Sequence, residues 1–442
     1  MGRKAFRAIA CLLPLLLFSF ASAWAGEVFE ATLKNGLKVL LKEDHRAPIA
    51  TFQVWYKVGS KNEGPGITGA SHLLEHMMFK GTERYSPMQF ARIVQKNGGW
   101  SNAFTGKDYT AYYENIAADR LELVLELEAD RMQNLLLDPQ EFKAEREVVK
   151  EERRLRIEDD PTSLLREELL ASAFKAHPYR QPVIGWMSDL ERITREDLYR
   201  YYKTYYVPNN ASIVAVGDFD KFEILKKIEK HFGPIPPGSN PPRPRTVEPE
   251  QNGERRLLLR KEAELPFLYI GYHTPSLTHP DRFALEVLSA ILSEGKSSRL
   301  YKGLVYDKQI ALYAGADYSW IHTDPNLFYF YASVLPGRTA EEVEKAIYAE
   351  IERLKGEPVS DRELQKAKNQ IEAFFILSQD SIFFQGEILG MHESVADWRL
   401  WEAYLPGIRA VTVEDVQKVA KKYYSEDNRT VAILAPIKGS SQ

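Results

Sequence analysis

The chain contains 442 residues, of which 44% are hydrophobic and 27% are charged, and its formal net charge is −4. This length and composition are sufficient for two or more globular domains with cores of their own. Proteins that bind nucleic acid are usually basic, so the acidic balance argues against nucleic-acid partners.

The first 25 residues have the organisation of a secretory signal peptide. Arg3, Lys4 and Arg7 form a basic start, residues 8–20 form an apolar run, and Ala23-Trp24-Ala25 forms a small-x-small cleavage site. The apolar run is short for a membrane span. We therefore predict signal cleavage and a bacterial periplasmic location, with secretion as a second option and an anchor formed by an uncleaved signal as a third.

Cleavage would also remove Cys11, which is the single cysteine of the chain. The mature protein would then contain no cysteine and form no disulfide bond. Loss of three positive charges and no negative ones takes the net charge from −4 to −7.

Strand and helix patterns alternate through the first half of the mature chain. The Asn-Gly pair within residues 33–41 predicts a β-hairpin. The further elements expected are a buried strand at 50–58, a glycine-rich loop at 64–69, a helix ended by Gly81, a helix at 88–96, strands at 98–105 and 109–116, and an amphipathic helix at 120–136.

The segment 70–79 carries the motif that suggests chemistry. In a helix, His72 and His76 lie four residues apart on one face, and Glu75 follows His72 by three residues. A catalytic zinc ion takes three protein ligands and keeps a fourth position for water. The motif predicts zinc bound by both histidines, with Glu75 as the general base for the zinc-bound water, whose pKa the metal lowers to about 7.

A chance occurrence is the alternative, because two histidines at helical spacing also arise without a metal. A second acidic segment, 145–152, bears on this choice. Glu145 and Glu152 are seven residues apart and share a helical face with Val148 and Val149 beside it. Acidic runs are commonly solvated, but the apolar pair on this face predicts that both carboxylates point inward.

With these residues the chain resembles the pitrilysin/insulinase family of zinc peptidases, the M16 inverzincins. The family pattern is His-x-x-Glu-His followed about 75 residues later by a ligating glutamate, with another acidic residue seven positions before it. The resemblance implies one zinc ion per chain, with Glu152 as its third ligand and Glu145 as a supporting carboxylate of the catalytic site. It also implies that Glu147 and Glu151 face solvent.

The stretch 98–105 resembles the family's Asn-Ala-x-Thr strand, which lies beside the metal. In the family this strand pairs with an extended substrate, so backbone hydrogen bonds give affinity with little demand on side chains. The resemblance implies substrate contacts from Asn102, Ala103 and Phe104. Without it, an ordinary edge strand would be the preferred interpretation.

A proline-rich segment divides the mature chain. Residues 233–253 contain seven prolines, which is incompatible with a core helix or a central strand and is typical of an extended linker. We predict a catalytic zinc-binding domain at 26–232, this linker, and a homologous peptidase-like domain without a zinc site at 254–442.

Two stretches repeat with an offset of 218 residues. Residues 193–217 are echoed by residues 411–435, each with a Thr-x-Glu-Asp start, a Tyr-Tyr pair and an Asn before a β-branched run. The repeat predicts two α+β domains related by duplication. The family resemblance implies that each is an α/β sandwich with an antiparallel-rich sheet and helices on one side, and that the two form a clam-like chamber.

The second half departs from the family pattern. Members often carry an Arg there, and a Tyr seven residues later, that hold the substrate backbone. Tyr313 matches the Tyr, but the Arg position falls on Val305 or Tyr306, which cannot form charged bidentate hydrogen bonds. We expect Arg299 to fix its own loop and infer that another chain supplies the pair. Five further histidines are interpreted as structural: His177, His273, His279, His322 and His392.

Together these features predict a zinc metalloendopeptidase that cleaves short or unfolded peptides bound as an added β-strand. The expected assembly is a heterodimer with a zinc-less homologous subunit, as in two-subunit members such as the mitochondrial processing peptidase, or a homodimer. The alternative function is a noncatalytic structural or chaperone-like subunit of such a complex, since a fold can persist after its chemistry is lost. The complete set of zinc-site residues favours the enzyme.

Overall fold

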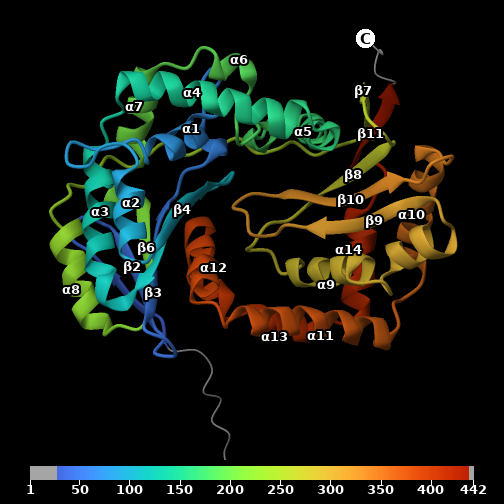
Figure 1. Cartoon of the computed structure of the whole chain (residues 1–442). Coiled ribbons are helices and arrows are strands. Elements are labelled where there is room, and N and C mark those ends of the chain that lie inside the picture. The colour runs from blue at the N-terminus through green and yellow to red at the C-terminus, as the bar shows by residue number, and fades with distance from the viewer. Residues whose placement is uncertain (1–26, 438–442) are drawn as a thin grey trace, which may run out of the picture.

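The structure, a computed structural model, describes residues 27–437 (Figure 1). It contains two mixed α+β halves, each built on one sheet, as the sequence repeat predicts. The proposed signal segment, including Cys11, lies outside the described residues. Among the described residues, no helix combines the length and apolar character needed to cross a membrane.

The first sheet has six strands in the order β1-β2-β6-β3-β5-β4, so β4 forms one edge. Only β2 and β6 are parallel neighbours. The predicted hairpin is present, with Gly36 at φ 86° in its turn. The strands are β1 (Phe29–Thr32), β2 (Lys38–Glu43), β3 (Ile49–Tyr56), β4 (Trp100–Thr105), β5 (Thr110–Ala117) and β6 (Ala211–Gly217).

The helices of the first half are α1 (Ala70–Met77), α2 (Gln89–Lys96), α3 (Leu121–Asn134), α4 (Pro139–Arg153), α5 (Pro161–Ala173), α6 (Met187–Leu190), α7 (Arg195–Tyr205) and α8 (Lys221–Phe232). The helices other than α5 cover one face of this sheet, and most of them contribute buried residues to its largest core. The expected helix end at Gly81 is wrong by one turn: α1 ends at Met77, and hydrogen-bonded turns continue the chain to Gly81 at φ 102°.

The second sheet has five strands in the order β7-β11-β8-β10-β9. Its strands are β7 (Arg255–Glu262), β8 (Phe267–Thr274), β9 (Ala311–Tyr318), β10 (Asn326–Val334) and β11 (Arg429–Ile437). The helices of the second half are α9 (Arg282–Ser293), α10 (Ala340–Gly356), α11 (Asp361–Ser378), α12 (Ile382–Val395), α13 (Tyr404–Ala410) and α14 (Val413–Tyr423). Neither helix nor strand occurs between α8 and β7.

The duplication extends to atomic detail. α7 and α14 occupy equivalent positions, and each begins with the same reciprocal cap, Thr194 with Asp197 and Thr412 with Asp415. The following strands β6 and β11 each pair in parallel with the first long strand of their half. Equivalent residues therefore close the two sheets in the same way.

Each half contributes one helix to the sheet of the other half. α12 packs against β3 and β6 of the first sheet, and α5 packs against β7, β8 and β11 of the second. Figure 1 shows α12 standing beside the first sheet and α5 reaching from α4 toward the second. The sheets are thus covered on both faces, which adds an exchange of helices to the sandwich expected from the sequence.

The exchanged helices bury apolar side chains that would otherwise face water. Trp55 and Val214 of the first sheet pack with Leu389 of α12, and Leu165 of α5 packs with Leu327 of the second sheet. Full burial of one such side chain stabilises the fold by about 1.5–3 kcal/mol. The exchange therefore joins the two halves by hydrophobic contact.

A buried polar cluster provides a second junction between the halves. Asp108 contacts Lys61, the Tyr179 hydroxyl and His322, with separations of 2.6, 2.8 and 3.0 Å. Burial raises the pKa of Asp108, but His322 and Lys61 outweigh this effect and hold the pKa below its usual range. The Nδ1 atom of His177 accepts the Tyr179 N–H at 3.2 Å, as suits a structural histidine.

The contact between α12 and the first sheet is tight enough to test. A Cβ on Gly390 would lie 2.1 Å from Trp55 Cε2, so we expect Gly390→Ala to destabilise the fold by about 1–3 kcal/mol. Gly303, also helical, has open space around it, and Gly303→Ala is the matched control, expected to be stabilising by about 0.5–1 kcal/mol. Denaturant midpoints measure both variants. Equal midpoints for Gly390→Ala and the wild type would show that α12 does not depend on this contact.

Candidate active site

Helix α1 presents the His-x-x-Glu-His motif from a rigid position. On the inner face of this helix, the side chains of Leu73, Leu74 and Met77 are fully buried. The helix is preceded by Gly69 at φ 89°, where a Cβ would lie 2.6 Å from the carbonyl oxygen of Ile184. Glycine is therefore required at this position, and the helix begins where the chain passes closest to that neighbouring segment.

A buried glutamate side chain completes the start of α1, which has no capping side chain of its own. Glu63 accepts the backbone N–H groups of Gly69 and Ser71, both at 2.7 Å. Burial raises the pKa of Glu63 to about 8, although these two hydrogen bonds act in the opposite direction. Glu63 therefore fixes the orientation from which the histidines project.

His72, His76 and Glu152 converge, although Glu152 lies on a different helix, α4. One ligand atom from each residue lies within 4.8 Å of the others. The Oε2 atom of Glu152 is 3.7 Å from His72 Nε2 and 3.5 Å from His76 Nε2. Within residues 27–437 this is the single group of three or more acidic, histidine or cysteine side chains with such geometry.

These separations fit a tetrahedral zinc ion. Zinc binds nitrogen and oxygen at about 2.0–2.2 Å, which places neighbouring ligand atoms about 3.4 Å apart. Burial lowers the pKa of His72 to about 3, so its ring is neutral, as a ligand must be. The donor set of two imidazoles and one carboxylate is that of catalytic zinc sites.

Glu145 lies behind His76 and orients it. Its Oε1 is 2.9 Å from His76 Nδ1, and its Oε2 is 2.5 Å from Lys80 Nζ. Because a carboxylate only accepts, Nδ1 carries the proton and Nε2 is left for a metal. Glu145 is buried, whereas Glu147 and Glu151 are exposed, as expected from the sequence.

Glu75 lies beside the ligands and is held by β4. The Thr105 hydroxyl, at the end of β4, donates to Glu75 Oε2 at 2.5 Å. Burial raises the pKa of Glu75, and the Thr105 hydrogen bond opposes that shift. A carboxylate with a raised pKa is a better proton acceptor near neutral pH.

A cavity of about 900 Å³ surrounds this site. It is lined by His72, Glu75, His76, Asn102, Ala103, Phe104, Thr105, Val148, Glu151, Glu152, Leu155, Arg156, Ile157, Val183 and Ile184. All three sequence-predicted contacts on β4 are therefore at the cavity. The Asn102 side chain accepts the backbone N–H of Ala103 at 2.9 Å, which orders the strand locally.

No side chain between residues 254 and 437 of the second half lines this cavity. Tyr313 is half exposed on β9 and lies in another cavity, next to Phe267. Arg299 is paired with Glu350 of α10 at 2.9 Å and with Glu363 of α11 at 2.8 Å, so it contacts two helices of the second half and not, as the sequence had predicted, its own loop. Within this chain, the structure does not bring Tyr313 to the predicted metal site.

Three residues that contribute to the site were not among the site residues predicted from the sequence. Glu63 precedes α1 in a loop with no motif, and Arg156 reaches back to Glu152 at 3.1 Å across one helical turn. Thr105 was visible as the last residue of the Asn-Ala-x-Thr pattern, but its bond to Glu75 depends on how β4 meets α1. Only the Arg156 contact follows from local helical spacing.

The Glu145 contact predicts a specific loss of metal affinity. We expect Glu145→Gln to weaken zinc binding about 10- to 100-fold, because the charge that fixes the His76 ring is removed. Competition with a chromogenic chelator measures this change. Glu141→Gln, one turn earlier on α4 and 3.7 Å from Lys80, is the matched control and should bind zinc as the wild type does. Equal affinities for the two variants would rule out an orienting role for Glu145.

Comparison with known proteins agrees with this geometry. A family model described as Insulinase (Peptidase family M16) matches residues 38–186, which contain every residue of the metal cluster. A second model, Peptidase M16 inactive domain, matches residues 192–371. The second of these regions contains no part of the cluster.

Individual relatives align over nearly the whole chain. The protein named zinc protease PqqE from Helicobacter pylori is 34% identical over 92% of both chains. A solved structure of a protease from Helicobacter pylori superposes with a TM-score of 0.90 at 34% identity, covering 93% of this chain and all of that one. The probable mitochondrial-processing peptidase subunit beta of Arabidopsis thaliana is 28% identical over 93% of this chain and 79% of its own. Because both halves match the family and so much of the chain aligns at this identity, the chain belongs to the insulinase family of peptidases, M16.

Proposed function

We propose that this protein is a zinc-dependent metalloendopeptidase that cleaves short or unfolded peptides. The observation that carries the proposal is the convergence of His72, His76 and Glu152 beside Glu75, in one cavity with the edge strand β4. The zinc protease names of relatives support the same chemistry. We further propose a periplasmic location, supported by the basic, apolar and small-residue pattern of residues 1–25.

The residues of the candidate active site have different roles in peptide hydrolysis. Zinc held by His72, His76 and Glu152 would supply a Lewis acid for the scissile carbonyl and lower the pKa of water. Glu75 takes the proton of the attacking water and delivers it to the leaving amine nitrogen. Thr105 holds one oxygen of Glu75, which leaves the other for the proton.

The β4 strand aligns the substrate. As an edge strand it has unpaired backbone groups along one side, and an extended peptide can add to them. Such binding reads the backbone more than the side chains, so it favours unstructured peptides of varied sequence. In a folded protein most strands are already paired on both sides, so few segments can add to β4 in this way.

Replacing Glu75 tests the chemistry. Glu75→Gln should keep zinc but lower turnover of an unstructured peptide by about 10²–10⁴-fold, because the proton acceptor is lost. Mass spectrometry of the products and the metal content of the mature protein are the measurements, and the protein's own mass shows whether residues 1–25 are removed. Glu147→Gln, an exposed carboxylate on α4, is the control and should cleave normally.

The same experiment distinguishes the alternative, a noncatalytic structural or chaperone-like subunit. The second half matches a model described as an inactive domain, and its described residues, up to 437, contain no metal cluster; both observations support a subunit role. Normal turnover by Glu75→Gln would reject Glu75 as the base. Bound zinc without cleavage by the wild type would favour the subunit role or an absent partner.

We also propose that a second chain, identical or a zinc-less homologue, completes the active site. Support comes from Tyr313 and Tyr306, which are exposed, and from Arg299, which is already paired within its own half. Peptidase activity per chain should therefore fall on dilution below the dimer dissociation range, or rise when a zinc-less homologue is added. Light scattering combined with activity assays checks this. Full activity from a strictly monomeric preparation contradicts the proposal.

A further inference from the structure

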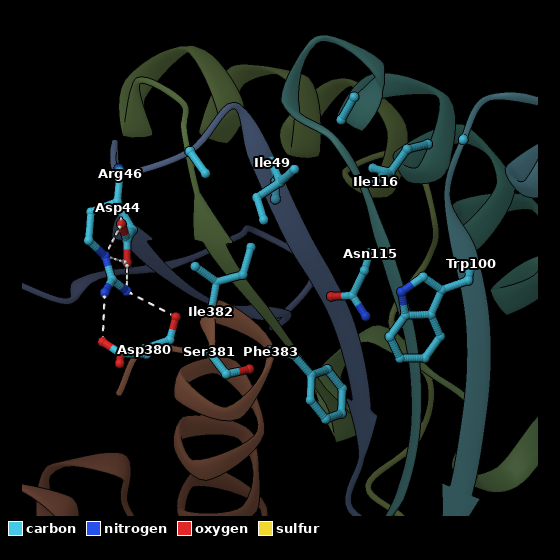
Figure 2. Close-up of a pocket in the computed structure, with 14 residues that line it drawn as sticks. Asp44, Arg46, Ile49, Trp100, Asn115, Ile116, Asp380, Ser381, Ile382 and Phe383 are labelled. Carbon is cyan, nitrogen blue, oxygen red and sulfur yellow. Dashed lines mark hydrogen bonds and ion pairs between the residues drawn. The ribbon is translucent and has the colours of Figure 1, made fainter. Parts of the chain in front are cut away.

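A second cavity, of about 640 Å³, lies where α12 begins beside the first sheet (Figure 2). We call it the distal cavity. It lies between the start of β3, the end of β5, the start of β4 and the first turn of α12. Its walls include Ile49, Trp100, Ile382 and Phe383, which Figure 2 shows around a common space. Ile49 and Trp100 remain 45% and 49% exposed, so large apolar surfaces here face solvent.

Asn115 supplies an unpaired amide to this cavity. Both its Nδ2 and its Oδ1 atoms are buried, and neither has a hydrogen-bond partner among residues 27–437. Buried polar groups in proteins are nearly always paired, and leaving one unpaired costs about 1–3 kcal/mol. The amide therefore leaves a donor and an acceptor unused at the wall of the cavity, whichever way it is turned. A peptide group presents the complementary acceptor and donor.

The charged side chains of the distal cavity are paired with one another. Arg46 contacts Asp44 at 2.7 Å and Asp380 at 3.3 Å. Figure 2 shows this ion-pair group at one side of the cavity, away from Asn115 and Trp100. At the side of Asn115 and Trp100, a ligand therefore contacts an apolar wall that, among the described residues, carries one amide and no free charge.

One strand connects the distal cavity with the predicted metal site. Trp100 is the first residue of β4 and lines the distal cavity, whereas residues 102–105 of the same strand line the cavity of Glu75. The five-residue step from Trp100 to Thr105 spans about 17 Å. Trp100 lies opposite Asn115 in the β4–β5 register, so both side chains are on one face of the sheet. A peptide added along β4 would pass both sites, with alternate side chains directed to each face.

We propose that the distal cavity binds a part of the substrate peptide about five residues from the scissile bond. An apolar or aromatic side chain packs against Trp100 and Phe383, and an adjacent peptide group pairs with the Asn115 amide. This inference rests on the proposed peptidase function and adds to it a preference for peptides long enough to span both cavities. The distal cavity thereby selects substrate length as well as apolar character at one position.

Binding of nested peptides tests the inference without relying on turnover. Fluorescently labelled peptides are titrated into zinc-loaded Glu75→Gln protein: an unstructured core peptide too short to span both cavities, and versions of it extended by about eight residues on one side or the other. We expect one extended peptide to bind about tenfold more tightly than the core. Asn115→Leu and Trp100→Ala, each added to Glu75→Gln, should raise its dissociation constant about 5- to 10-fold and leave that of the core peptide unchanged.

Controls distinguish a failure of the inference about the distal cavity from a failure of the proposed catalysis. Leu258→Ala removes an equally exposed apolar side chain from β7 of the second sheet and should change neither constant. Equal affinity of core and extended peptides, or equal weakening of both by the two variants, overturns the inference. If the length preference and its loss are observed but the wild type cleaves no peptide, the distal cavity stands and the proposed catalysis fails. If the wild type cleaves peptides but shows no length preference, the proposed catalysis stands and the inference about the distal cavity fails.

Discussion

A sheet has two faces, and neither half of this protein covers both faces of its own sheet. The exchange of α5 and α12 meets this constraint by hydrophobic burial. It also positions the predicted metal site, because α4 runs through a single irregular turn into α5. Glu152 is the last residue but one of α4, so the third ligand lies where the chain leaves one half to cover the other.

A buried ion pair stabilises that turn. Arg153, next to Glu152, forms two hydrogen bonds with Glu167 of α5 and a third with the carbonyl of Gly185. Removing one member of such a pair leaves a buried charge uncompensated, which is strongly destabilising. The metal site and the packing of the two halves therefore share a structural element, and the ligand on α4 is not placed by its own helix alone.

Three glutamate side chains around α1 have separate roles because each has a different partner. Glu63 accepts backbone N–H groups at the start of the helix, Glu145 accepts from the far side of His76, and Glu75 is held by Thr105 from β4. The same β4 is the free edge on which a peptide can add, and it joins the metal cavity to the distal cavity. Substrate alignment, base orientation and distal recognition thus depend on a single strand.

The sequence by itself determined the features that repeat over short distances. Helical spacing places His72 and His76 together and puts Glu145 and Glu152 on one face, and the repeat at 218 residues predicts the equivalent caps of α7 and α14. The family pattern linked the histidine segment at 70–79 with the acidic segment at 145–152. Tertiary structure alone decided what depends on contact between distant segments: the helix exchange, the capping of α1 by Glu63, the position of Tyr313 away from the site, and the unpaired amide of Asn115. These features arise from how apolar faces are covered and which polar atoms are left facing a cavity, and no local periodicity in the chain encodes either.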